Sequence, residues 1–256
     1  MTGVSVLLRK ELLESWRTLR LPIVTGLFLL VGLSSPLLAK FLPEIIEAAA
    51  GSQLPPIPIP TPVAADAADQ LWKNLAQFGA IAAIVLAMGA VSTERDRGTA
   101  AFVLSKTASR GAFLGAKVAA IAAVLGAGVI LAVVVAWVYT AILFEPLPVG
   151  GWIAFGLLAW VGLSVWAALT FAGSTVTGST AAAAGIGFVG LLLLSIASAI
   201  PTIGRYLPGG LAGPAVALAS GVPVEVGDVL APMLGSLVVI AVALGISVWS
   251  FRRQEL

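Results

Sequence analysis

The chain has 256 residues, of which 59% are hydrophobic and 10% are charged, and its mean hydropathy is +1.07. Soluble domains carry about 25% charged residues, so this composition argues against a soluble core and favours a membrane protein. The net charge is +2, and the chain contains neither cysteine nor histidine, which excludes disulfide frameworks, thiol nucleophiles and histidine-based metal sites.

Residues 1–20 predict an amphipathic helix that does not span the membrane. Apolar residues such as Leu12 and Trp16 recur at near-helical spacing, while Lys10 and Arg17 take the other side. A helix of this kind lies in the membrane interface, with its apolar face among acyl chains and its cations near anionic headgroups. The alternative is a cytoplasmic extension of the first span with ordinary flanking charge.

Six long apolar segments follow, and we interpret each as a transmembrane helix. About 20 helical residues cross the roughly 30 Å of hydrocarbon, and a helix satisfies its own backbone polar groups in lipid. A closed β-barrel would need short alternating segments instead. The predicted fold is therefore an all-α membrane protein with one six-span domain, residues 21–256. The predicted spans are residues 21–39, 75–91, 118–143, 152–171, 181–200 and 229–249.

The connecting segments differ in character. The first outer loop, residues 40–73, carries five prolines within residues 54–62, which predict an extended spacer, with a proline-rich recognition motif as the alternative. The stretch "FLPEIIEAAA" before these prolines can form a short outer helix. Residues 173–180, "GSTVTGST", predict a polar inner turn. Residues 201–228 are punctuated by glycine and proline and fit either a surface helix or a partial re-entry.

The distribution of Lys and Arg predicts that both termini are cytoplasmic, because cytoplasmic segments carry an excess of these residues. With this orientation, eleven of the 14 cationic residues lie on the inner side. The inner set comprises Arg9, Lys10, Arg17, Arg20, Arg95, Arg97, Lys106, Arg110, Lys117, Arg252 and Arg253, and the outer set comprises Lys40, Lys73 and Arg205.

The predicted spans contain no Asp, Glu, Lys, Arg or His. Ion-coupled transporters usually keep such residues inside their spans, so this absence disfavours, without excluding, an ion-coupled carrier. No G-x-S-x-G arrangement and no phosphate-binding loop is present, so we expect no catalytic residue, cofactor or metal in this chain. We expect five tryptophans to lie mostly near the interfaces or on lipid-facing sides. These are Trp72, Trp152, Trp160, Trp166 and Trp249.

Residues 92–117 form an inner loop that gathers charge on both sides of a short apolar turn containing Phe102 and Leu104. A positive-inside flank explains the cations alone. The order of the pieces, charged then apolar then charged, fits a short docking helix whose apolar residues contact a partner and whose charges set its register.

This loop resembles the segment after the second span of type-2 ATP-binding cassette (ABC) transporter permeases. The matching positions are Glu94, Gly98, Thr99, Leu104, Ser105, Ser109, Arg110 and Lys117. The opening "LLRKELLESWRTLRLPI" is similar to the family's interfacial elbow helix, with Lys10 and Glu11 matching. One departure is Lys106-Thr107, where the family often has a proline.

The resemblance implies a division of labour. This chain would be the permease subunit of an exporter in the cytoplasmic membrane, paired with a second permease copy in a homodimer. Two cytoplasmic ABC ATPase subunits would bind ATP and Mg²⁺ and hydrolyse the ATP. The coupling residues implied within 94–110 are Glu94, Arg97, Gly98, Thr99, Phe102, Leu104, Ser105, Ser109 and Arg110, and the elbow residues are Lys10, Glu11, Trp16 and Arg17. The alternatives are a non-transporting membrane anchor or accessory subunit and, less favoured, an ion-coupled transporter.

Overall fold

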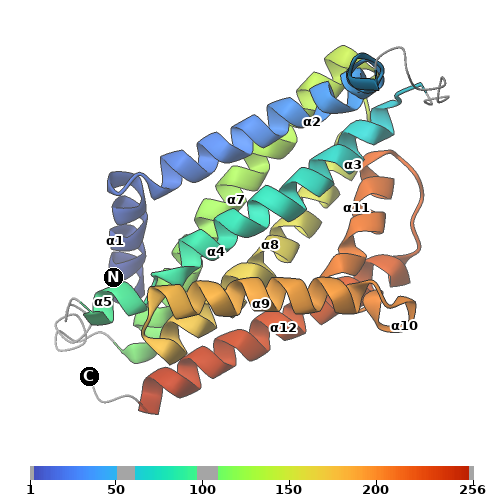
Figure 1. Cartoon of the computed structure of the whole chain (residues 1–256). Helices are drawn as coiled ribbons and strands as arrows, with labels where there is room; N and C mark the ends of the chain where they lie inside the picture. The colour runs from blue at the N-terminus through green and yellow to red at the C-terminus, as the bar shows by residue number, and fades with distance from the viewer. Residues whose placement is uncertain (1–2, 51–60, 97–108, 254–256) are drawn as a thin grey trace.

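The computed structural model describes residues 3–50, 61–96 and 109–253, and within these ranges every regular element is a helix. Figure 1 shows long helices running side by side between two ends of a bundle, with α1 set across one end. The helices, in chain order, are α1 (Gly3–Arg17), α2 (Arg20–Ala50), α3 (Ala64–Asn74), η2 (Leu75–Gly79), α4 (Ala80–Met88), α5 (Ser92–Asp96), α7 (Arg110–Leu143), α8 (Val149–Thr177), α9 (Thr180–Ser198), α10 (Pro201–Gly204), η3 (Pro208–Leu211), α11 (Ala212–Ala219) and α12 (Val226–Arg253).

Six helical segments in the described part are long and apolar enough to cross a membrane, which confirms the all-α fold and the number of spans. They are Arg20–Ile46, Ala64–Arg95, Arg110–Leu143, Val149–Thr177, Thr180–Ser198 and Val226–Arg253. Each contains one predicted span, except that the fifth helix ends at Ser198 rather than at residue 200.

The predicted outer loop, residues 40–73, is too long. Helix α2 continues to Ala50 and α3 begins at Ala64, so both ends of that loop are helical. The stretch "FLPEIIEAAA" is helical as expected, but it continues α2 instead of forming a separate helix. Hydropathy locates the part of a helix that lies in hydrocarbon. It does not detect the polar helical turns that continue a span beyond the hydrocarbon, where Ala and Glu still favour helix.

The predicted inner loop, residues 92–117, is also too long. Ser92–Asp96 is the short helix α5, and Arg110–Lys117 forms the first two turns of α7. At 1.5 Å per residue the 34 residues of α7 measure about 51 Å, far more than the ~30 Å of hydrocarbon. Lys117 therefore lies in a helix while still being near its end.

The second span is built from three helical pieces. Helix α3 passes through η2, a single π-helical turn, into α4. Just before this turn, the buried Asn74 donates a 2.8 Å hydrogen bond to Ser35 Oγ on α2. Wide π turns inside α-helices occur where a helix absorbs one extra residue, and they are frequent at functional sites.

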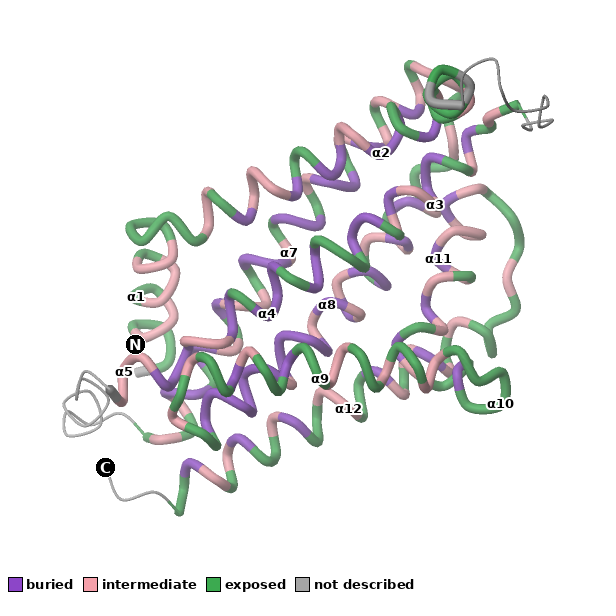
Figure 2. Tube along the Cα trace, in the orientation of Figure 1, coloured by how far each residue is buried: buried purple, intermediate pink, exposed green. Residues whose placement is uncertain are grey.

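Helix α8 lies at the centre of the bundle. It packs against α4, α7, α9, α11 and α12, and α2 lies along α7. Figure 2 shows buried residues concentrated on the helices at this centre, whereas α9 and α12 present long exposed stretches. The largest fully buried side chains include Phe28, Phe155 and Phe171.

Two of the five tryptophans do not face lipid, whereas their depth in the membrane stays a prediction. Trp152 and Trp166 are buried in the core, at 2% and 8% exposure, whereas Trp249 is 58% exposed. Trp72 packs edge-to-face on Phe155 at 5.6 Å between ring centroids, and Trp160 Nε1 donates a 2.9 Å hydrogen bond to the Ala122 carbonyl. The position of a residue in the sequence predicts its depth along a helix. It does not predict which face of an evenly apolar helix is buried against its neighbours.

Residues 201–228 fold back onto the bundle. Helix α11 packs against α8 and α3, and Leu211, Ala215 and Ala219 are fully buried there (Figure 1). A β-carbon at Gly151 would lie 1.9 Å from the Leu218 carbonyl oxygen, so only glycine permits this close approach of α8 and α11. The segment thus contains a short helix packed on the bundle, and the choice between a surface helix and a partial re-entry stays a prediction.

Candidate coupling site at the junction of α1, α5 and α7

Three helices meet at the end of the bundle where α1 lies. Helix α1 ends at Arg17, the chain turns at Leu19 with φ of 60°, and α2 begins at Arg20. Helix α5 follows the end of α4 across a short turn, and α7 begins at Arg110. This geometry brings charged side chains that are 23 to 106 residues apart in sequence into one cluster.

The cluster consists of Lys10, Glu11 and Glu14 from α1, Glu94 from α5 and Lys117 from α7, and we call it the ion cluster. Lys117 Nζ lies 2.9 Å from Glu94 Oε1 and 3.1 Å from Glu11 Oε1. Lys10 Nζ lies 2.9 Å from Glu94 Oε1, 3.1 Å from Glu11 Oε1 and 3.2 Å from Glu14 Oε2. Both ammonium groups therefore bridge α1 and α5.

The ion cluster is graded from buried to exposed. The side chain of Lys117 is 4% exposed, those of Glu94 and Glu11 are 13% and 14%, and that of Lys10 is 42%. Burial lowers the pKa of Lys10, but its hydrogen bond to Glu94 and the charges of Glu11 and Glu94 outweigh burial and raise that pKa above its ordinary value. Lys10 therefore stays protonated, and its attraction to the carboxylates persists throughout the physiological pH range.

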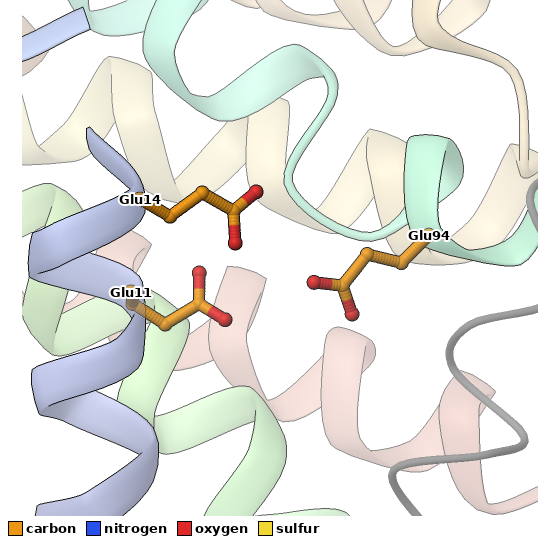
Figure 3. A group of neighbouring side chains, drawn as sticks. All are labelled: Glu11, Glu14 and Glu94. Atoms are coloured by element: carbon orange, nitrogen blue, oxygen red, sulfur yellow. The ribbon is translucent and has the colours of Figure 1, made fainter. Parts of the chain in front are cut away.

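The carboxylates alone resemble a cation site. Oxygens of Glu11, Glu14 and Glu94 lie within 4.8 Å of one another, and Figure 3 shows the three side chains pointing toward one another from α1 and α5. The two lysine ammonium groups already contact these oxygens. The cluster is thus an ion-pair network that joins helices.

A second set of contacts holds α5 from the opposite side. The backbone N–H groups of Val91 and Ser92 both donate to Ser174 Oγ at 3.1 Å, and the Ser92 and Thr180 hydroxyls are 3.0 Å apart. Arg95 Nη1 donates to the Thr175 carbonyl at 3.4 Å. We call Ser174, Thr175 and Thr180 the hydroxyl seat.

The hydroxyl seat is formed by a helix end and a helix start. Helix α8 ends at Gly178, which has φ of 65°, a left-handed conformation that glycine adopts without strain. Ser179 then caps α9 by accepting a hydrogen bond from the Ala182 N–H. This tight turn brings the last residues of α8 and the first of α9 to α5.

The start of α7 contacts the end of α12. Ser109 accepts a hydrogen bond from the Ala112 N–H at 3.1 Å and so caps α7. Arg110 Nη1 donates to the carbonyls of Phe251 and Arg252 at 2.9 and 3.0 Å, which satisfies orphan carbonyls at the C-terminal end of α12. The rings of Phe113 and Phe251 stack with centroids 5.7 Å apart.

Comparisons with known proteins agree with this arrangement. A family model described as ABC-2 family transporter protein matches residues 5–217, most of the chain. The chain belongs to the ABC-2 transporter family. It is also 31% identical over 264 residues to the protein named "Uncharacterized transmembrane protein YxlG" from Bacillus subtilis (strain 168), and the match covers 100% of this chain and 99% of that protein.

Membership in the ABC-2 family makes this chain an ABC transporter permease and a multi-pass integral membrane protein. The predicted elbow residues divide between two environments. Lys10 and Glu11 join the ion cluster, while Trp16 and Arg17 are exposed on α1. Among the predicted coupling residues, Glu94 also lies within the ion cluster, and Ser109 and Arg110 anchor the ends of α7 and α12.

The remaining predicted coupling residues of the ABC-2 chain lie outside the described residues. They are Arg97, Gly98, Thr99, Phe102, Leu104 and Ser105. The described residues on both sides of this stretch are those held by the ion cluster, the hydroxyl seat and the end of α12.

Sequence reasoning missed the hydroxyl seat of this permease. The stretch "GSTVTGST" predicts a polar inner turn, and it does form a turn, but Ser174, Thr175 and Thr180 also hold α5. The available signal was five hydroxyl residues without any charge at a membrane boundary. Lys117 was recognised only as the start of a span, because its partners Glu11 and Glu94 are distant in sequence.

Proposed function

We propose that this chain is the membrane subunit of an ATP-driven exporter, in which a separate cytoplasmic ATPase moves the spans through the segment 94–110. One observation carries the proposal. Both flanks of this segment are fixed to the bundle, Glu94 by the ion cluster and Ser109–Arg110 by α7 and α12. A force on the segment would therefore act on α1, α5, α7, α8, α9 and α12 together.

The proposed complex contains two copies of an ABC ATPase, which bind ATP and Mg²⁺, and a second permease copy. A bundle whose charges are paired at one end has no evident group for ion coupling, so its driving force must come through a contact with a partner. Two positions of such a bundle, biased by the nucleotide state of the ATPase, would give alternating access. The termini, the segment 94–110 and α1 would then face the cytoplasm, with α1 at the inner surface of the cytoplasmic membrane.

The test is affinity purification of the chain in mild detergent, with identification of a Walker-motif ATPase and measurement of the ATP hydrolysis that coelutes. The double variant Phe102→Asp with Leu104→Asp should lose the ATPase, because aspartate removes the apolar contact of the docking element. The matched control is Val222→Asp, an exposed apolar position before α12. It should retain the ATPase in full.

The two rival functions give different results. If the ATPase still copurifies with the double variant, the coupling assignment is wrong. A stable complex without any coeluting ATP hydrolysis would favour the membrane-anchor or accessory function. Transport by the purified chain that needs a proton or sodium gradient and no ATP would favour the ion-coupled function.

A further inference from the structure

A cavity of about 450 Å³ lies beside the ion cluster, between α1, α4 and α7. This volume falls in the range of small-molecule binding sites, about 300–1,000 Å³. The ion cluster forms part of its wall, but the ABC-2 permease function described above makes no use of the cavity itself.

The wall of the cavity is amphiphilic. Helices α4 and α7 contribute the apolar side chains. Charges and hydroxyls come from α1 and the turn after it, from the start of α2, from α5 and from Lys117 of α7. The apolar residues are Leu86, Ala120, Ile121 and Val124, and the polar ones are Lys10, Glu11, Glu14, Ser15, Thr18, Arg20, Thr93, Glu94 and Lys117. An apolar wall joined to a charged one fits a ligand that has an apolar part and a polar head.

The charges of the lining are balanced, with three cations and three carboxylates. Lys10, Lys117, Glu11 and Glu94 are engaged in the ion cluster. Arg20 has no ion pair within the described ranges, and Glu14 has a single one, to Lys10, with 40% of its side chain exposed. The cavity thus offers a ligand the guanidinium of Arg20 and the second carboxylate oxygen of Glu14, Oε1, which has no ion pair within the described ranges. These two groups fit a zwitterion.

We propose that this cavity binds the headgroup of a phosphatidylethanolamine-type phospholipid. The phosphate bonds to Arg20, the primary ammonium bonds to Glu14 and nearby hydroxyls, and the acyl chains follow the apolar wall of α4 and α7. The inference rests on the proposed position of α1 at the membrane surface. A lipid held there would contact α1 directly beside the residues that fix α5.

The chemistry of the wall distinguishes this occupant from other lipids. Pockets for acidic phospholipids carry an excess of Lys and Arg, whereas this lining is neutral. Quaternary ammonium groups are recognised by aromatic rings, and none of the described residues lining the cavity is aromatic. A primary ammonium instead donates up to three hydrogen bonds, which carboxylate and hydroxyl oxygens accept.

The test measures lipid binding to the purified full-length chain in detergent by native mass spectrometry. Phosphatidylethanolamine is titrated against phosphatidylcholine and phosphatidylglycerol of the same acyl chains. We expect phosphatidylethanolamine to bind tightest. The variant Arg20→Ala should weaken that binding about tenfold, the usual result of losing one charge-assisted hydrogen bond. Glu14→Gln should reduce the preference for ethanolamine over choline.

Arg252→Ala is the matched control, because Arg252 is an exposed arginine at the end of α12 that does not line the cavity. It should bind phosphatidylethanolamine like the parent chain. Equal weakening by Arg252→Ala and Arg20→Ala, or a preference for phosphatidylglycerol, would overturn the proposal. So would stabilisation by a divalent cation that EDTA removes and Glu14→Gln abolishes.

The lipid measurement needs no ATPase, so it is separable from the exporter proposal. Lipid binding as expected without any copurifying ATPase would support the lipid site and count against the exporter. An ATPase that copurifies with a chain indifferent to these lipids would overturn the lipid site alone.

Discussion

At the scale of single residues, Lys117 is the most consequential side chain of the ion cluster. It is 4% exposed and contacts both Glu11 and Glu94. Replacing one partner of a buried ion pair is far costlier than replacing the pair, because the remaining charges are left buried and unmatched.

We therefore expect Lys117→Met to lower the free energy of unfolding by about 3 kcal/mol, measured from the melting of the purified chain in detergent. Adding Glu11→Gln and Glu94→Gln to Lys117→Met should recover much of the loss. The control is Lys73→Met, which breaks a surface ion pair with Asp69 and should cost about 0.5 kcal/mol or less. Equal losses for the two lysines would contradict the internal role of Lys117.

Two glycines of α2 provide a second residue-scale comparison. A β-carbon at Gly32 would lie 2.6 Å from the Ala132 carbonyl oxygen on α7, whereas one at Gly26 would meet nothing within 4 Å. A backbone atom cannot rotate away, so Gly32→Ala must separate α2 from α7.

The expected result for Gly32→Ala is a destabilisation of about 1–3 kcal/mol, typical of overpacking. Gly26→Ala should leave the melting temperature unchanged or raise it slightly, since alanine favours helix. If thermal melting in detergent ranks the two variants the other way, the packing of α2 on α7 is not as described.

At the scale of elements, the position of α5 depends on Ser174. Its hydroxyl accepts from two backbone N–H groups, those of Val91 and Ser92, at the point where the chain leaves α4. Ser174→Ala removes this shared acceptor and should leave both donors without a partner.

We expect Ser174→Ala to cost about 1–3 kcal/mol and to increase hydrogen exchange at residues 91–96, because buried donors without partners are unfavourable. Ser236→Ala is the control. Ser236 is equally buried, but its hydroxyl contacts only the Pro232 carbonyl of its own helix. Exchange at residues 91–96 that does not differ between the variants would show that the hydroxyl seat does not hold α5.

The elements themselves were largely predictable, and their ends were not. Hydropathy located all six spans, because apolar length alone decides whether a helix can cross hydrocarbon. It missed the polar helical ends of the spans at residues 40–50, 64–73 and 110–117. These helical ends follow from helix propensity and capping. The start of α3 had a readable signal, because Asp66 accepts a hydrogen bond from the Val63 N–H.

The sequence predicted where the candidate site lies, but it did not predict which of its side chains contact one another. The resemblance selected Lys10, Glu11, Glu94 and Lys117 separately, as marks of an elbow and a coupling loop. That they bond to one another follows only from the bend at Leu19 and the course of α4 and α7. Evenly apolar helices such as α8 likewise do not indicate which face is buried, so the burial of Trp152 and Trp166 could not be predicted.

At the scale of the whole molecule, the two ends of the bundle differ. The ion cluster and the contacts of Arg110 lie at the end of the bundle that holds both α1 and the C-terminal end of α12 (Figure 1). Exposed apolar residues such as Phe188, Leu192 and Leu193 cover α9. Lipid or a second copy of the chain can cover such a face, so the homodimer remains a prediction.

The orientation of the bundle can be measured directly, because the chain contains no cysteine and any introduced one is unique. With the α1 end in the cytoplasm, Ser105→Cys and Ser179→Cys should react with a membrane-impermeant maleimide only after the cells are opened. Ser52→Cys should react in intact cells. Ser179 is exposed at the start of α9, and Val222→Cys, exposed before α12, provides a second outer position. The reverse pattern would place the ion cluster and the segment 94–110 outside the cell, where no ATPase could reach them, and the proposed exporter mechanism would fail.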